Sequence, residues 1–98
     1  MLVKIHNSYR SIIAVCDTNL LGKTFEEGNR QIVINPNFFQ GEEKTEQDIL
    51  KLMQDAAAED STFNIVGKES VKTALKAGII KKSGIMKIQG VPVALVLL

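Results

Sequence analysis

The stretch FNIVGKES at residues 63–70 decides the fold, because it joins an apolar run to a helical pattern through a Gly-Lys pair. The apolar run TFNIV (62–66) predicts a buried strand, and the spacing of apolar residues after Lys68 predicts a helix over 68–77. Gly78 is then the residue that ends this helix. Turns that hold nucleotide phosphates have the same outline, so that function has to be tested first.

A phosphate-binding P-loop requires a glycine, four residues, a Gly-Lys pair and then Ser or Thr. Here Thr62 stands at the first glycine position and Glu69 at the hydroxyl position, so the backbone cradle and the magnesium ligand are both missing. Gly67 also stands alone, which excludes the dinucleotide-binding fingerprint. We interpret Gly67 as a turn residue and expect Glu69 or Ser70 to satisfy free backbone N–H groups in the first helical turn.

A second helix and several strands can be predicted on either side of this junction. Thr45 is a suitable N-cap, and after it apolar residues recur on one helical face as far as about residue 59. The run IIAVC (12–16) does not alternate, which is typical of a strand covered on both faces. Further strands are expected at 2–5, 30–34, 62–66, 85–88 and 93–97, whereas 20–28 is expected to be a helical turn or irregular.

The elements together predict an α+β fold. We expect a single domain over residues 1–98, with a mixed β-sheet of five or six short strands packed by two α-helices. The length of 98 residues suits one domain, and 45% apolar and 23% charged residues are typical of a globular protein. The longest apolar run without a charge, residues 88–98, is short of the ~20 residues that a membrane helix needs.

Cysteine usage and the N-terminus bear on the compartment. One cysteine excludes an internal disulfide and suits a reducing cytoplasm. The first ten residues lack the long apolar core of a signal peptide. We therefore expect a cytoplasmic protein.

Charge is divided along the chain. Residues 42–60 hold seven acids and two lysines, a net charge of −5, and residues 61–98 hold six lysines and one acid, a net charge of +5. Lys68, Lys72 and Lys76 recur every four residues, so at about 100° per residue they form one stripe mostly opposite the apolar face. Lys81, Lys82 and Lys87 follow.

Together these lysines predict contact with the phosphates of RNA or DNA, without reading of bases. We place the candidate site at Lys68, Lys72, Lys76, Lys81 and Lys82. The alternative is an ordinary solvated face, since lysine is a common helix former and Glu69 lies beside the stripe.

Few residues in the sequence could form a catalytic group. His6 and Cys16 are the only residues of their kinds, and a hairpin turning near Ser8 and Tyr9 would hold them roughly 15 Å apart, at ~3.3 Å per residue. We interpret Cys16 as a small buried apolar residue and His6 as a partly exposed strand end. No His/Cys spacing matches a zinc site. The sequence therefore predicts no catalytic residue, no metal and no cofactor.

Aromatic residues offer two contact surfaces. Tyr9 and Arg10, at the expected hairpin tip, could stack on a base, although we favour a tyrosine that folds back on the sheet. Phe38 and Phe39 are adjacent, so one ring is expected in the core and the other is a candidate interaction surface.

Four segments in matching order resemble the DUF424 family: IIAVCDTNLLGKTFEEG, NFFQGE, FNIVGKESVKTALKAGII and KIQGVPVALVLL. The resemblance implies an archaeal cytoplasmic protein, with a place near translation or RNA, and it supplies no catalytic residues. Two hypotheses follow. The protein is an RNA-binding or ribosome-associated module that uses the lysines, or it is a protein-interaction or oligomerisation module that uses Phe38 and Phe39 or an exposed sheet edge. An enzyme is a third class.

Overall fold

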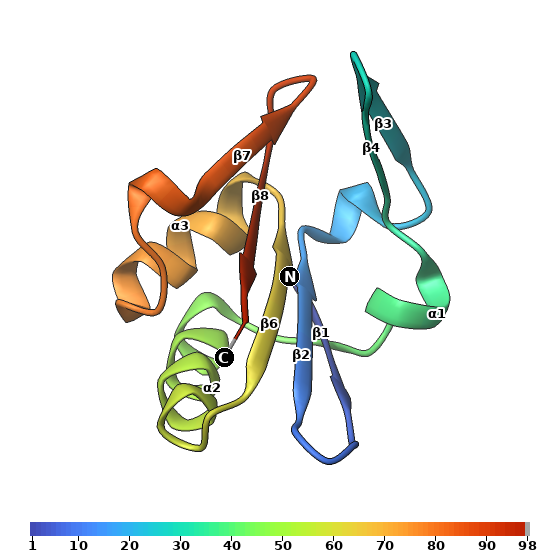
Figure 1. The fold of residues 1–98 in the computed structure, drawn as a ribbon. Helices are drawn as coiled ribbons and strands as arrows, with labels where there is room; N and C mark the ends of the chain where they lie inside the picture. The colour runs from blue at the N-terminus through green and yellow to red at the C-terminus, as the bar shows by residue number, and fades with distance from the viewer. Residues whose placement is uncertain (98) are drawn as a thin grey trace.

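The chain builds a mixed sheet of six strands, in the order β5-β1-β2-β6-β8-β7, and a separate two-stranded sheet (Figure 1). The computed structural model describes residues 1–97. The large sheet consists of β1 (Leu2–His6), β2 (Ile12–Cys16), β5 (Glu42–Glu43), β6 (Thr62–Val66), β7 (Ile85–Ile88) and β8 (Val91–Val96). The small sheet consists of β3 (Thr24–Glu27) and β4 (Arg30–Val33), and the helices are α1 (Pro36–Phe39), α2 (Glu46–Ala58) and α3 (Lys68–Ala77). The predicted α+β class with a mixed sheet is confirmed.

Strand β2 is central and is buried on both faces. It pairs antiparallel with β1 and parallel with β6. The parallel pairing is possible because the long connection between β2 and β6 carries the chain back across the sheet through α2. Ile13 and Val15 face one layer, and Ala14 and Cys16 face the other. The predicted strand with two covered faces is therefore confirmed.

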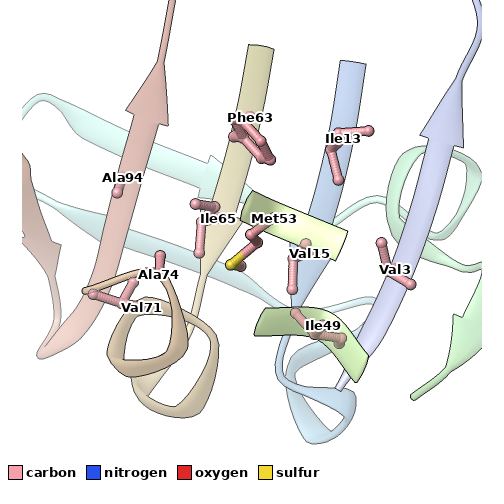
Figure 2. Close-up of a cluster of buried hydrophobic side chains, with 10 residues drawn as sticks. All are labelled: Val3, Ile13, Val15, Ile49, Met53, Phe63, Ile65, Val71, Ala74 and Ala94. Atoms are coloured by element: carbon pink, nitrogen blue, oxygen red, sulfur yellow. The ribbon is translucent and has the colours of Figure 1, made fainter. Parts of the chain in front are cut away.

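The main core lies between the sheet and helices α2 and α3, which cover one side of it (Figure 1). Figure 2 shows the side chains of the sheet and of both helices pointing toward one another. This core contains Val3, Ile13, Val15, Ile49, Met53, Phe63, Ile65, Val71, Ala74 and Ala94. A second cluster on the other side joins the sheet to α1 and the β3–β4 hairpin, through Leu2, Ala14, Cys16, Ile34, Phe39, Val66 and Val93.

Helix α2 begins as predicted. Thr45 Oγ1 accepts a hydrogen bond of 3.2 Å from the Asp48 N–H, which confirms the N-cap. Ile49 and Met53 are fully buried under the sheet. The helix ends at Ala58, where the chain leaves through Asp60 at a φ of 59°.

The prediction of a helical turn or irregular segment at 20–28 is wrong for its second half. Only Thr18–Leu20 forms a short 3-10 turn, and Thr24–Glu27 is strand β3. Glu27 pairs with Arg30, so Gly28 and Asn29 form a two-residue hairpin turn with Gly28 at a φ of 63°. The predicted strand at 30–34 consequently pairs with β3 and not with the large sheet.

Candidate nucleic-acid interface

The N-terminus of α3 is occupied by a carboxylate from the end of β2. Asp17 Oδ2 accepts from the Glu69 N–H at 3.1 Å, and Asp17 Oδ1 accepts from the Ser70 N–H and the Ser70 hydroxyl, both at 2.8 Å. Strands β2 and β6 are parallel neighbours that end together at Cys16 and Val66, so the residue after β2 reaches the helix that follows β6. The prediction that Glu69 or Ser70 caps this helix is wrong.

Gly67 allows the carboxylate to approach. Its φ is +113°, in a region that side chains disfavour, and a Cβ built there would lie 2.3 Å from Asp17 Cγ. The prediction of a turn glycine is therefore confirmed. The Asp17 carboxylate is the anion that interacts with the positive end of the helix dipole. The N-terminus of α3 is consequently not a phosphate site, although helix N-termini attract phosphate in general.

Three lysines from two elements line one groove. Lys68 and Lys72 of α3 and Lys87 of β7 surround a hollow of about 300 Å³ between the helix and the edge of the sheet. Its apolar lining includes Val71, Leu75, Ile85 and Pro92. Within residues 1–97, none of these three ammonium groups forms an ion pair. We call these lysines the groove lysines.

The other predicted lysines have different surroundings. Lys76 Nζ lies 2.9 Å from Glu46 Oε1, a half-exposed ion pair that joins α3 to α2 and lowers the pKa of the Glu46 carboxyl. Lys81 and Lys82 are exposed beyond the end of α3, where Lys81 lines a different groove with Ile80 and Leu97. The predicted lysine stripe is therefore divided: Lys68 and Lys72 line the groove, whereas Lys76 pairs with Glu46.

Lys87 follows the predicted stripe in the sequence but is not among the five predicted site residues. Its register partner is Pro92, and its neighbour Ile85 faces the helix layer, so alternation along β7 places Lys87 on the same side. The signal was present in the sequence IMKI (85–88), but it could be used only once the strand was known to lie beside α3.

The aromatic residues divide between core and surface. Phe39 is buried, which confirms that one ring enters the core. Phe38 is half-buried and stacks on His6 with ring centroids 4.5 Å apart, and the Phe38 carbonyl oxygen lies 2.8 Å from His6 Nε2. Tyr9 is fully exposed beside exposed Arg10, so the favoured reading of a tyrosine folded back on the sheet is wrong.

Cys16 and His6 lie at opposite ends of the β1–β2 hairpin. Cys16 faces Leu2, and His6 faces Ile12. Burial raises the pKa of the Cys16 thiol to about 11, which keeps it protonated and unreactive at neutral pH. In the described chain, no group of three His, Cys, Asp or Glu side chains is arranged to hold a metal ion.

None of the helices formed by residues 1–97 has the length and apolar character needed to cross a membrane.

Comparison with known proteins identifies the family and leaves the activity open. No curated protein matches the sequence. The fold matches the crystal structure of an uncharacterized conserved protein from Methanopyrus kandleri with a TM-score of 0.85. That alignment covers 96% of this chain and 87% of the other at 24% identity, so it shows a shared fold alone. The sequence model of DUF424, a protein of unknown function, matches residues 5–98. The chain therefore belongs to the DUF424 family, as the four segments indicated.

Proposed function

We propose that the groove lysines Lys68, Lys72 and Lys87 bind the phosphate backbone of RNA. The supporting observation is that three ammonium groups from two elements surround one groove, and that none is neutralised by an acid within residues 1–97. Lys68 and Lys72 are one helical turn apart, and Lys87 faces them from the strand. Such an arrangement can contact successive phosphates of one strand.

The chemistry of the groove favours contact with the backbone over reading of sequence. Its floor is aliphatic and accepts the apolar face of a sugar or base, and no aromatic side chain lines it for base stacking. Lysines hold phosphates as point charges and carry no base information. Binding should therefore depend strongly on salt and weakly on sequence.

RNA of the translation apparatus is the partner class to test first. A folded RNA exposes closely spaced phosphates, and the family resemblance implies an archaeal cytoplasmic protein near translation. The net charge of +5 over residues 61–98 would attract such a polyanion from a distance, whereas residues 42–60 would repel it and so orient the protein.

Two charge-matched triple variants test the proposal. Lys68→Gln, Lys72→Gln and Lys87→Gln remove the groove lysines, and Lys76→Gln, Lys81→Gln and Lys82→Gln remove three other lysines of the same region. Affinity for a single-stranded RNA of mixed sequence is measured over a range of salt concentrations. We expect the first triple variant to lose binding and its salt slope to fall by ~0.7 for each contact removed. The second should change affinity much less.

Two outcomes would contradict the proposal. Equal losses in the two triple variants would mean that diffuse charge, and not the groove, attracts RNA. If the wild-type protein shows no affinity at about 50 mM salt, where phosphate contacts are strong, the groove does not bind RNA.

A further inference from the structure

One edge of the large sheet is only partly covered. Strand β5 pairs with Leu2 and Val3 of β1 and then stops. The chain enters β5 through Gly41, which passes β1 so closely that a Cβ would lie 2.0 Å from the Val3 carbonyl oxygen. Beyond this point, residues 4–6 of β1 have no partner strand on that side.

The backbone groups of Ile5 point to the open edge. The Lys44 N–H donates to the Met1 carbonyl at 2.9 Å. The backbone N–H and C=O groups of odd-numbered residues of β1 therefore point toward β5. The backbone groups of even-numbered residues point toward β2, because hydrogen bonds alternate between the two sides of an antiparallel strand. It follows that the N–H and C=O of Ile5 are available to an added strand. Unpaired edges of this kind accept extended chains.

A groove runs beside this edge, between β1 and α2. Its volume is about 520 Å³, and Ile5, Leu52 and Ala56 form its apolar surface. Ile5 is 49% exposed although its register partner Ile13 is buried. A smaller hollow of about 260 Å³ shares Ile5 and Leu52 and continues the groove toward Gly41. Every second side chain of an added strand would point into this space.

The helix wall of the groove is acidic. Three acids, Asp48, Asp55 and Glu59, line it. Two lysines, Lys44 and Lys51, lie among them. Both lysines are engaged: Lys44 pairs with Glu42 at 3.2 Å, and Lys51 pairs with Asp55 at 3.9 Å. Asp48 and Glu59, toward the two ends of the helix, have no ion-pair partner within residues 1–97. In the part of the groove that lies beside α2, the uncompensated charge is therefore negative.

We propose that the β1 edge and the β1–α2 groove bind an extended basic segment of a partner protein by strand addition. Main-chain hydrogen bonds to Ile5 hold the segment, and the side chains on its groove-facing side make the other contacts. A central apolar side chain contacts Ile5 and Leu52, and basic side chains two positions before and after it reach Asp48 and Glu59. The site lies on a different element from the groove lysines, so this inference is independent of the proposed RNA contact.

A defined peptide tests this inference. The probe is the acetylated, amidated peptide Lys-Thr-Val-Thr-Lys, here called the basic peptide, whose Lys and Val side chains share one face of an extended strand. It is titrated into the full chain while backbone amide shifts are followed. We expect shifts and intermolecular contacts at residues 4–6 and at Leu52. The acidic peptide Glu-Thr-Val-Thr-Glu should bind more weakly, as should the basic peptide with the backbone N–H groups that face β1 methylated.

Variants locate the site. Ile5→Pro removes the N–H that points to the open edge, and edge strands tolerate proline. The variant should weaken peptide binding about tenfold, which is the effect of one lost hydrogen bond. If that variant does not fold, Ile5→Thr keeps the N–H and removes the apolar contact. The matched control is Leu95→Thr, because Leu95 is 53% exposed on the opposite face of the sheet. Asp48→Asn with Glu59→Gln should weaken binding at low salt and have little effect at high salt.

Several results would overturn the assignment. One is an absence of shifts at Ile5 with about 1 mM of the basic peptide, the weak end of measurable affinity. Another is equal binding of the acidic peptide. Equal loss in Leu95→Thr would also overturn it. If the mass of the free protein doubles with concentration and Ile5→Pro abolishes the doubling, a second copy of this chain occupies the edge instead.

Discussion

Helices α2 and α3 pack against each other and against the same face of the sheet, yet their first turns are stabilised in different ways. Helix α2 is capped by Thr45, the residue just before it. Helix α3 is capped by Asp17, which is 52 positions from Glu69 in the chain. The first cap is formed by local sequence, whereas the second exists only after β2 and β6 have paired. The difference teaches that α3 depends on the sheet and that α2 depends on it less.

Gly67→Ala should have the largest effect on stability. Alanine at a φ of +113° is strained, and its Cβ would displace the Asp17 carboxylate from the helix. We expect a loss of at least about 3 kcal/mol in the free energy of unfolding, from backbone strain and lost charged hydrogen bonds. Denaturant unfolding measures it. A change as small as that of a typical surface substitution would mean that Asp17 does not need this close approach.

Asp17→Ala should follow, with a loss of about 2–3 kcal/mol, because two N–H groups and the Ser70 hydroxyl lose a charged acceptor. It also empties the helix N-terminus. Added sulfate should therefore stabilise Asp17→Ala more than it stabilises the wild type. Asp17→Asn, which keeps one oxygen acceptor, is the matched control and should lose less. Equal stabilisation of variant and wild type by sulfate would show that the carboxylate does not occupy an anion site.

The two helices also show how much of the structure could be predicted. Both had local signals: Thr45 before α2, and Gly67 and Gly78 on either side of α3. Their positions were therefore predicted closely. The Asp17 cap was missed because its partner is distant in sequence. Strand β3 was missed because TFEE (24–27) has one apolar residue and no alternating pattern, so Gly28-Asn29 is its only local hairpin signal.

In the candidate site, too, local sequence places some residues and only the tertiary structure places others. Lys68 and Lys72 could be placed from helical spacing alone. Lys87 required knowledge that β7 lies beside α3, and the engagement of Lys76 required knowledge that Glu46 faces it from α2. Charge patterns along the chain locate a basic region, but only tertiary structure shows which of its charges are free.

Thr45→Ala should have a smaller effect, about 1 kcal/mol, since one neutral cap is lost from a helix whose buried face remains intact. Amide exchange separates the two kinds of cap. In Thr45→Ala the amides of the first turn of α2 should exchange faster while those of α3 are unchanged. In Asp17→Ala faster exchange should extend to the whole of α3. Identical exchange patterns in the two variants would remove the distinction between a local and a long-range cap.

The smallest effect concerns the ion pair that joins the two helices. Lys76 lowers the pKa of the Glu46 carboxyl through a hydrogen bond and its charge. A carboxyl whose pKa is depressed in the folded state contributes stability above its unfolded pKa, and this contribution is lost as pH falls through the folded pKa. Lys76→Gln should therefore reduce stability slightly at neutral pH and not at all in acid, because exposed pairs are weak. An NMR titration of Glu46 gives the direct measurement. Its pKa should rise toward the ordinary value of 4.5 in Lys76→Gln and stay low in Lys81→Gln. If both variants titrate like the wild type, the two helices are held together by their apolar contacts alone.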